Sequence, residues 1–174
     1  MKILVTYWSQ TGNTKRVAEA VFEALPGEKT ILPMNQVASA NGFDLILAGF
    51  PVMQFGPPPA AGEFIRKYTA GRKTALFVTH AMPVHSNDSR QQALLEKVLA
   101  RCRAAASASE VVGFFHCQGE LSETTAAGLL DSDIPELRRF AFMRPLTLGH
   151  PRREALEQAA VFGRTIAGDD PDIL

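Results

Sequence analysis

Apolar residues follow two different periods along this chain. Continuous apolar runs of strand length occupy residues 3–8, 44–49, 74–79 and 110–117, and a weaker run covers residues 30–32. Other stretches carry apolar residues with the spacing of an amphipathic helix, within residues 15–25, 61–68, 89–103 and 151–167. The pattern predicts five strands that alternate with helices.

This alternation predicts a doubly wound α/β domain, in which a parallel sheet is covered by helices on both faces. After Asp44, the run at residues 44–49 is apolar throughout, as expected of a parallel strand that is buried on both sides. Connections are short and there is no repeat, which indicates a single domain over residues 1–174. With the strand order 2-1-3-4-5, a ligand is expected beyond the carboxyl ends of the first and third strands.

The loop after the first strand is rich in hydroxyl and amide side chains and leads directly into a helix. It consists of Ser9, Gln10, Thr11, Gly12, Asn13 and Thr14. The N–H groups of a first helical turn lack partners within the helix, and the helix dipole favours negative charge there. The loop is therefore suited to hold a phosphate. The alternative is an ordinary turn whose Ser, Thr and Asn residues only cap the helix.

Three further loops reach the same edge of the predicted sheet. We expect ligand contacts from Pro51, Val52, Met53, Gln54, Phe55 and Gly56, from Thr79, His80, Ala81 and Met82, and from Cys117, Gln118 and Gly119. Phe55 lies among Gly and Pro residues, outside any helical or strand period, which favours a ligand contact. For His80 the alternatives are proton exchange and a loop histidine without chemical role. For Cys117 the more common case is a buried, inert thiol.

Together these features resemble the flavodoxin-like family. The arrangement strand–Ser9-Gln10-Thr11-Gly12-Asn13-Thr14–helix is similar to the phosphate-binding fingerprint of flavodoxins, and residues 49–58 are similar to the second flavin loop of the broader group. The resemblance implies a noncovalent FMN, with its phosphate on the first loop and its ring held by the second and third. No Gly-x-Gly-x-x-Gly follows a strand and no P-loop motif occurs, so a dinucleotide-binding Rossmann domain and a P-loop NTPase are both unsupported.

The charge balance and the cysteine content limit the kinds of partner and ligand that we expect. Eighteen basic residues balance eighteen acidic ones, which disfavours a nucleic-acid binder. The sequence shows no membrane span and no signal peptide, so we expect a cytoplasmic protein. Two cysteines without a recognisable ligand spacing predict no metal site.

Two departures from electron-carrying flavodoxins bear on function. Such carriers are usually acidic and stack the flavin with an aromatic residue from each of two loops, whereas this chain is neutral and has no Phe, Tyr or Trp in residues 79–113. Both departures favour an FMN-dependent oxidoreductase that reduces a small organic acceptor. A flavodoxin-type carrier that serves a redox protein partner stays open, as does a flavin-free interaction module.

A long segment, residues 118–150, separates the last strand from the last helix. Its aromatic and basic side chains are Arg138, Arg139, Phe140, Phe142 and Arg144. They would suit an anionic or aromatic substrate or a protein contact, and the segment would then be a lid, a substrate wall or a partner surface. The alternative is a structural flap that covers an edge strand.

Overall fold

A computed structural model describes residues 1–168 of the chain and shows a five-stranded parallel sheet with the order β2-β1-β3-β4-β5. The strands are β1 (Lys2–Tyr7), β2 (Glu28–Pro33), β3 (Leu45–Pro51), β4 (Lys73–His80) and β5 (Glu110–Gln118). All four neighbouring pairs are parallel, and β1 lies between β2 and β3. The predicted doubly wound sheet and its strand order are therefore confirmed.

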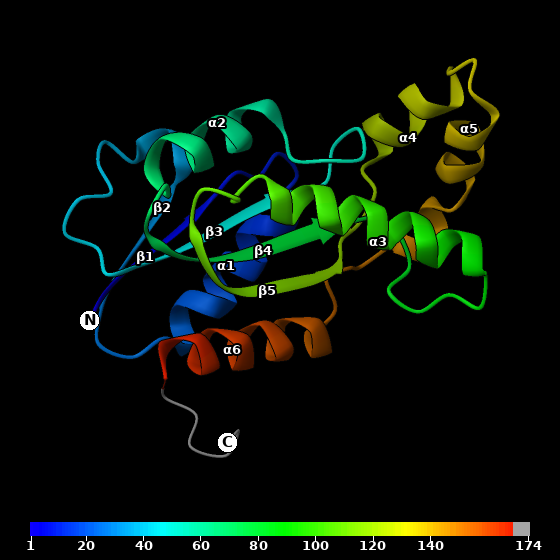
Figure 1. The fold of residues 1–174 in the computed structure, drawn as a ribbon. Coiled ribbons are helices and arrows are strands. Elements are labelled where there is room, and N and C mark those ends of the chain that lie inside the picture. The colour runs from blue at the N-terminus through cyan, green and yellow to red at the C-terminus, as the bar shows by residue number, and fades with distance from the viewer. Residues whose placement is uncertain (169–174) are drawn as a thin grey trace.

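Helices cover both faces of this sheet (Figure 1). They are α1 (Asn13–Ala24), α2 (Pro59–Tyr68), α3 (Ser89–Ala104), α4 (Glu123–Leu130), α5 (Pro135–Phe142) and α6 (Arg153–Ala167), with short 3₁₀ turns η1 (Met34–Gln36) and η2 (Arg144–Thr147). Within residues 1–168, no helix combines the length and the apolarity that a membrane span requires.

The core forms two layers, because successive side chains of each strand point to opposite faces of the sheet. On one face, Leu4, Ile46 and Leu76 pack under α2 and α3. On the other face, Val5 and Leu47 pack under α1 and α6. Burial on both faces explains why these strands are apolar throughout, as the sequence pattern predicted.

The segment after β5 folds into a separate helical arm. Helices α4 and α5 pack against each other beyond the carboxyl ends of the central strands (Figure 1). A small cluster formed by Leu121, Ala126 and Ala141 holds them together, and Ala81 and Phe140 pack against this cluster. We call residues 123–142 the helical arm.

Several element boundaries differ from the sequence-based expectation by one or more residues. Helix α1 begins at Asn13, two residues earlier than expected, so Asn13 and Thr14 belong to its first turn. The last helix begins at Arg153 and not at Pro151. Strands β4 and β5 extend to His80 and Gln118, because both residues pair in the parallel ladder.

Candidate functional site

A cavity of about 540 Å³ opens at the carboxyl ends of β1, β3 and β4. Fifteen residues expected from the sequence line it: Ser9, Gln10, Thr11, Asn13, Thr14, Pro51, Val52, Met53, Gln54, Phe55, Thr79, His80, Ala81, Met82 and Gly119. Four expected residues, Gly12, Gly56, Cys117 and Gln118, are not part of its lining. The first, second and third loops therefore meet around one space, at the switch point of the sheet.

The first loop presents an uncapped helix start to this cavity. Gly12 is the N-cap of α1 with φ 95°, and among residues 1–168 no side chain caps this helix. By contrast, Asp88 caps α3 and Ser122 caps α4. The hydroxyl of Ser9 accepts a hydrogen bond from the Gly12 N–H at 3.1 Å, which stabilises the loop itself. The capping alternative is therefore wrong for this loop, and the first-turn N–H groups of α1 are left for an anion.

The first loop is tied to the third. The buried hydroxyls of Thr14 and Thr79 are hydrogen bonded at 2.8 Å. This bond joins the start of α1 to the end of β4, so an anion site at α1 and the wall around residues 79–82 keep a defined separation.

The second loop contains a tight turn with an unusual backbone. Met53 and Gly56 exchange two backbone hydrogen bonds, of 2.8 and 3.0 Å. The two residues between them, Gln54 and Phe55, have positive φ angles of 48° and 64°. Both central residues of a type I′ turn need positive φ, and Asn-Gly is the usual pair there. A bulky residue in this conformation is strained, and such strain is concentrated at functional sites. The turn holds Phe55 at the cavity, with 40% of the residue exposed.

His80 is a buried, neutral side chain. Its Nδ1 lies 3.0 Å from the Met82 carbonyl, which only accepts, so Nδ1–H is the donor. Nε2 then accepts a hydrogen bond of 3.0 Å from Nδ1–H of His116. Burial, and next the charge of His116, lower the pKa of His80 to about 3. Partial burial, Arg103 and His85 lower the pKa of His116 as well. Of the two expectations for His80, this geometry fits a residue that holds the third loop and carries no exchangeable charge near neutral pH.

Both cysteines are buried, and neither lines the cavity. Cys117 packs in the core beneath α1 and α6, and burial raises the pKa of its thiol to about 12. Cys102 packs beneath α3, and burial likewise raises its pKa to about 12. A thiol with so high a pKa is a poor nucleophile, so Cys117 behaves as a small apolar core residue.

The outer wall of the cavity was not predicted residue by residue. It consists of Leu94, Glu120, Leu121, Ser122, Thr125, Leu129, Glu136, Leu137 and Phe140. Apart from Leu94 of α3, these residues belong to the helical arm and the segment that leads into it. The length and aromatic content of residues 118–150 were the only signals that pointed there. Among the described residues, no Lys or Arg lines this cavity.

Two arginines of the long segment, Arg138 and Arg144, contact other residues of the same segment. Arg138 donates to the carbonyl of Ser132 at 2.6 Å. Arg144 lies 3.9 Å from a carboxylate oxygen of Glu120. Arg138, Arg139 and Arg144 do not line the cavity, whereas Phe140 does.

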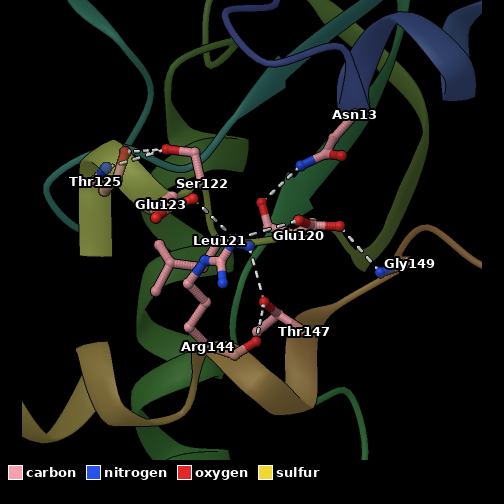
Figure 2. Close-up of polar contacts among 9 residues, drawn as sticks. All are labelled: Asn13, Glu120, Leu121, Ser122, Glu123, Thr125, Arg144, Thr147 and Gly149. Carbon is pink, nitrogen blue, oxygen red and sulfur yellow. Dashed lines mark hydrogen bonds and ion pairs between the residues drawn. The ribbon is translucent and has the colours of Figure 1, made fainter. Parts of the chain in front are cut away.

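A polar network joins the base of the arm to the first loop (Figure 2). The side-chain amide of Asn13 donates to the carbonyl of Glu120 at 2.8 Å. The carboxylate of Glu120 accepts the Gly149 N–H at 3.0 Å, and the Leu121 N–H donates to the hydroxyl of Thr147 at 2.9 Å. A Cβ on Gly119 would lie 2.9 Å from the Asn13 amide nitrogen, so only glycine fits beneath this contact.

A second cavity, of about 750 Å³, lies on the other side of the first loop. It shares Ser9 and Gln10 with the first cavity and is also lined by Gly12, Trp8 and residues of α2. It is larger, but the second and third loops do not reach it. Chemistry at the switch point therefore belongs to the 540 Å³ cavity.

The residues around this cavity fit FMN. The uncapped start of α1 suits a phosphate, and the apolar and aromatic walls suit a flavin ring. The bound cofactor would supply one- and two-electron chemistry, while the protein binds it, orients it and tunes its electronics. Ser9–Thr14 would hold the phosphate, and residues 51–55 and 79–82 the ring.

Three known proteins similar to this chain are described as flavodoxins or as flavodoxin-like. Flavodoxin-like domain-containing protein BilS of Clostridioides difficile (strain CD3) is 25% identical over 175 residues, which cover 95% of this chain and 96% of the relative. An archaeal flavodoxin structure superposes with a TM-score of 0.57 at 16% identity, covering 97% of each chain. Flavodoxin 2 of Bacillus cereus gives a TM-score of 0.55 at 17% identity, covering 98% of this chain and 100% of its own. The flavodoxin-domain family model matches residues 4–138. This chain therefore belongs to the flavodoxin domain family, and it is an FMN-binding protein.

Proposed function

We propose that this FMN protein transfers electrons to or from a protein partner that docks on the helical arm. The supporting observation is a set of exposed apolar side chains on the helical arm and the segment that follows it, Leu130, Ile134, Phe142, Leu146 and Leu148, which we call the arm patch. Phe142 is 73% exposed and Leu146 is 65% exposed. Exposed apolar side chains gathered on one part of a protein commonly mark interaction sites.

The neutral charge of the chain is compatible with this proposal. Acidic carriers are steered to basic partners by long-range attraction, which salt screens. A protein of zero net charge with an apolar patch would instead dock through short-range apolar contact. Electron transfer to such a partner is expected to depend weakly on ionic strength.

The test uses the FMN-loaded protein under anaerobic conditions with NADPH and a ferredoxin–NADP⁺ reductase as the probe partner. We expect no bleaching of the flavin by NADPH or NADH alone, and bleaching once the reductase is added. Phe142→Asp in the arm patch should slow this reductase-dependent step and leave reduction by dithionite unchanged. Val161→Asp, an exposed apolar residue on α6, is the matched control. Rapid bleaching by NADPH alone would contradict the proposal.

The second candidate is an FMN-dependent oxidoreductase that reduces a small organic acceptor. It is supported by the apolar outer wall of the cavity, where Leu94, Leu129 and Leu137 extend beyond the three loops. In such an enzyme two electrons and two protons would pass from the reduced cofactor to the acceptor. A reduced nicotinamide would supply both electrons and one proton as hydride, or a reduced protein would supply the electrons, and solvent would supply the remaining protons. Direct bleaching by NADH or NADPH, followed by saturable reoxidation with a quinone, would favour this candidate over the carrier.

A further inference from the structure

The third loop provides no Phe, Tyr or Trp side chain to stack on the flavin ring. Residues 79–113 contain no Phe, Tyr or Trp, so neither the end of β4, the loop after it nor α3 brings such a ring to the cavity. Among the described lining residues, the phenylalanine besides Phe55 is Phe140 of the helical arm. We propose that α5 provides the second aromatic wall of the flavin-ring site, with Phe140 as the ring contact and Leu137 beside it.

The two faces of α5 divide these roles. Glu136, Leu137 and Phe140 lie at i, i+1 and i+4 and line the cavity together. Phe142 does not line the cavity and is 73% exposed. One short helix therefore presents one phenylalanine to the cavity and another to solvent.

Packing holds Phe140 at the cavity wall. The side chain is half-buried and contacts the core beneath α2 and α3. It also contacts the small cluster of Leu121, Ala126 and Ala141 that joins the arm to the domain. A ring fixed from two sides loses little further rotamer freedom when a ligand stacks on it, which favours tight binding.

The position of the arm depends on the first loop. Asn13, in the first turn of α1, donates to the Glu120 carbonyl at the base of the arm (Figure 2). Asn13 also lines the cavity near the expected phosphate. We assign Asn13 as a positioning residue, because its amide holds the segment that carries Phe140 next to the loop that holds the phosphate.

Two ligands separate ring contacts from phosphate contacts. FMN and riboflavin share the ring, but riboflavin has no phosphate. Phe140→Ala should weaken both ligands by the same factor, roughly 2- to 12-fold, the value of an aromatic pair. Phe142→Ala, the same substitution on the opposite face of α5, should change neither. Ser9→Ala in the first loop should weaken FMN more than riboflavin. Equal dissociation constants for Phe140→Ala and wild type, or a Phe140→Ala effect on FMN alone, would overturn the proposal.

Two further variants guard against a folding defect. Phe140→Leu keeps an apolar side chain in the arm but removes the ring. If its melting temperature without flavin matches wild type while both ligands bind more weakly, stacking is supported. Phe140→Trp should quench the emission of bound riboflavin further. Unchanged riboflavin affinity in Phe140→Leu together with unchanged emission in Phe140→Trp would refute the ring contact.

Asn13→Asp tests the positioning role. The carboxylate is nearly isosteric with the amide but has no N–H to donate to Glu120. Riboflavin, which has no phosphate to be repelled, should bind more weakly to this variant, and its emission should be less quenched than in wild type. Unchanged riboflavin affinity and emission would show that Asn13 does not position the arm.

Discussion

Replacement of Phe55 by glycine or by alanine should separate backbone strain from cofactor binding. Phe55 occupies a left-handed conformation with φ 64° in the turn Met53–Gly56. Such a conformation costs an L-residue about 1–2 kcal/mol, and glycine avoids this cost. Glycine also gives the unfolded chain more freedom, which costs about 0.4–1 kcal/mol relative to alanine. Phe55→Gly should therefore be about 0.5–1 kcal/mol more stable than Phe55→Ala.

The two variants lose the same ring, so their difference in stability isolates the strain. For a chain of this size the difference corresponds to roughly 1–4 °C in melting temperature. The measurement is a thermal or urea unfolding curve without flavin, because a bound ligand would itself raise the transition. Both variants should bind riboflavin roughly 2- to 12-fold more weakly than wild type, as expected for a lost aromatic contact.

Two results would refute this reasoning. If Phe55→Ala is as stable as Phe55→Gly, the turn is not strained in solution. If either variant keeps wild-type riboflavin affinity, the Phe55 ring is not a flavin contact, and the positive φ has no role in binding.

Three other predictions concern the same region. The pKa of His80 is lowered from 6.5 to about 3, so below pH 6.5 the unfolded chain binds a proton that the folded protein excludes. Stability is thus retained at neutral pH and lost on acidification, by about 2 kcal/mol at pH 5 for this group. Urea unfolding at pH 7.5 and pH 5 should show this loss, and His80→Gln should reduce it; an equal loss in both proteins would exclude His80 as its source. Gly119→Ala should weaken FMN binding, because the added Cβ would push the Asn13 amide away from Glu120. The control is Gly128→Ala in α4, where the space around the glycine is open, and it should raise the free energy of unfolding by about 0.5–1 kcal/mol. Equal FMN affinity in the two variants would contradict the Asn13 contact. The thiols of Cys102 and Cys117 are buried, and their pKa values are raised to about 12. Both should resist alkylation by iodoacetamide at pH 8 in the native protein and react in urea, as measured by mass spectrometry. Rapid labelling of Cys117 in the native protein would show that this thiol is accessible.

Local patterns were sufficient for the sheet and for much of the cavity. The apolar runs and helical spacings predicted a parallel sheet between helices, because parallel strands covered on both faces leave a continuous apolar signal. The order β2-β1-β3-β4-β5 was expected from the doubly wound architecture, in which it is a common order. Once that order is set, the loops after β1, β3 and β4 must meet at the switch point. The position of single side chains was less accessible from the sequence. Cys117 and Gln118 end β5, yet neither lines the cavity, and Cys117 packs in the core beneath α1 and α6.

The sequence by itself therefore determined the α/β class, and it predicted the loop Ser9–Thr14 as an anion site. Only the tertiary structure decided what closes the cavity. Asn13 and Glu120 are 107 residues apart, and their hydrogen bond places the helical arm above the first loop. Nothing in the period of residues 123–142 indicates which face of α5 meets the cavity, since Phe140 and Phe142 are equally apolar. That choice depends on the packing of Phe140 against two buried clusters and on the polar network at the base of the arm, which are long-range contacts and leave no local signature.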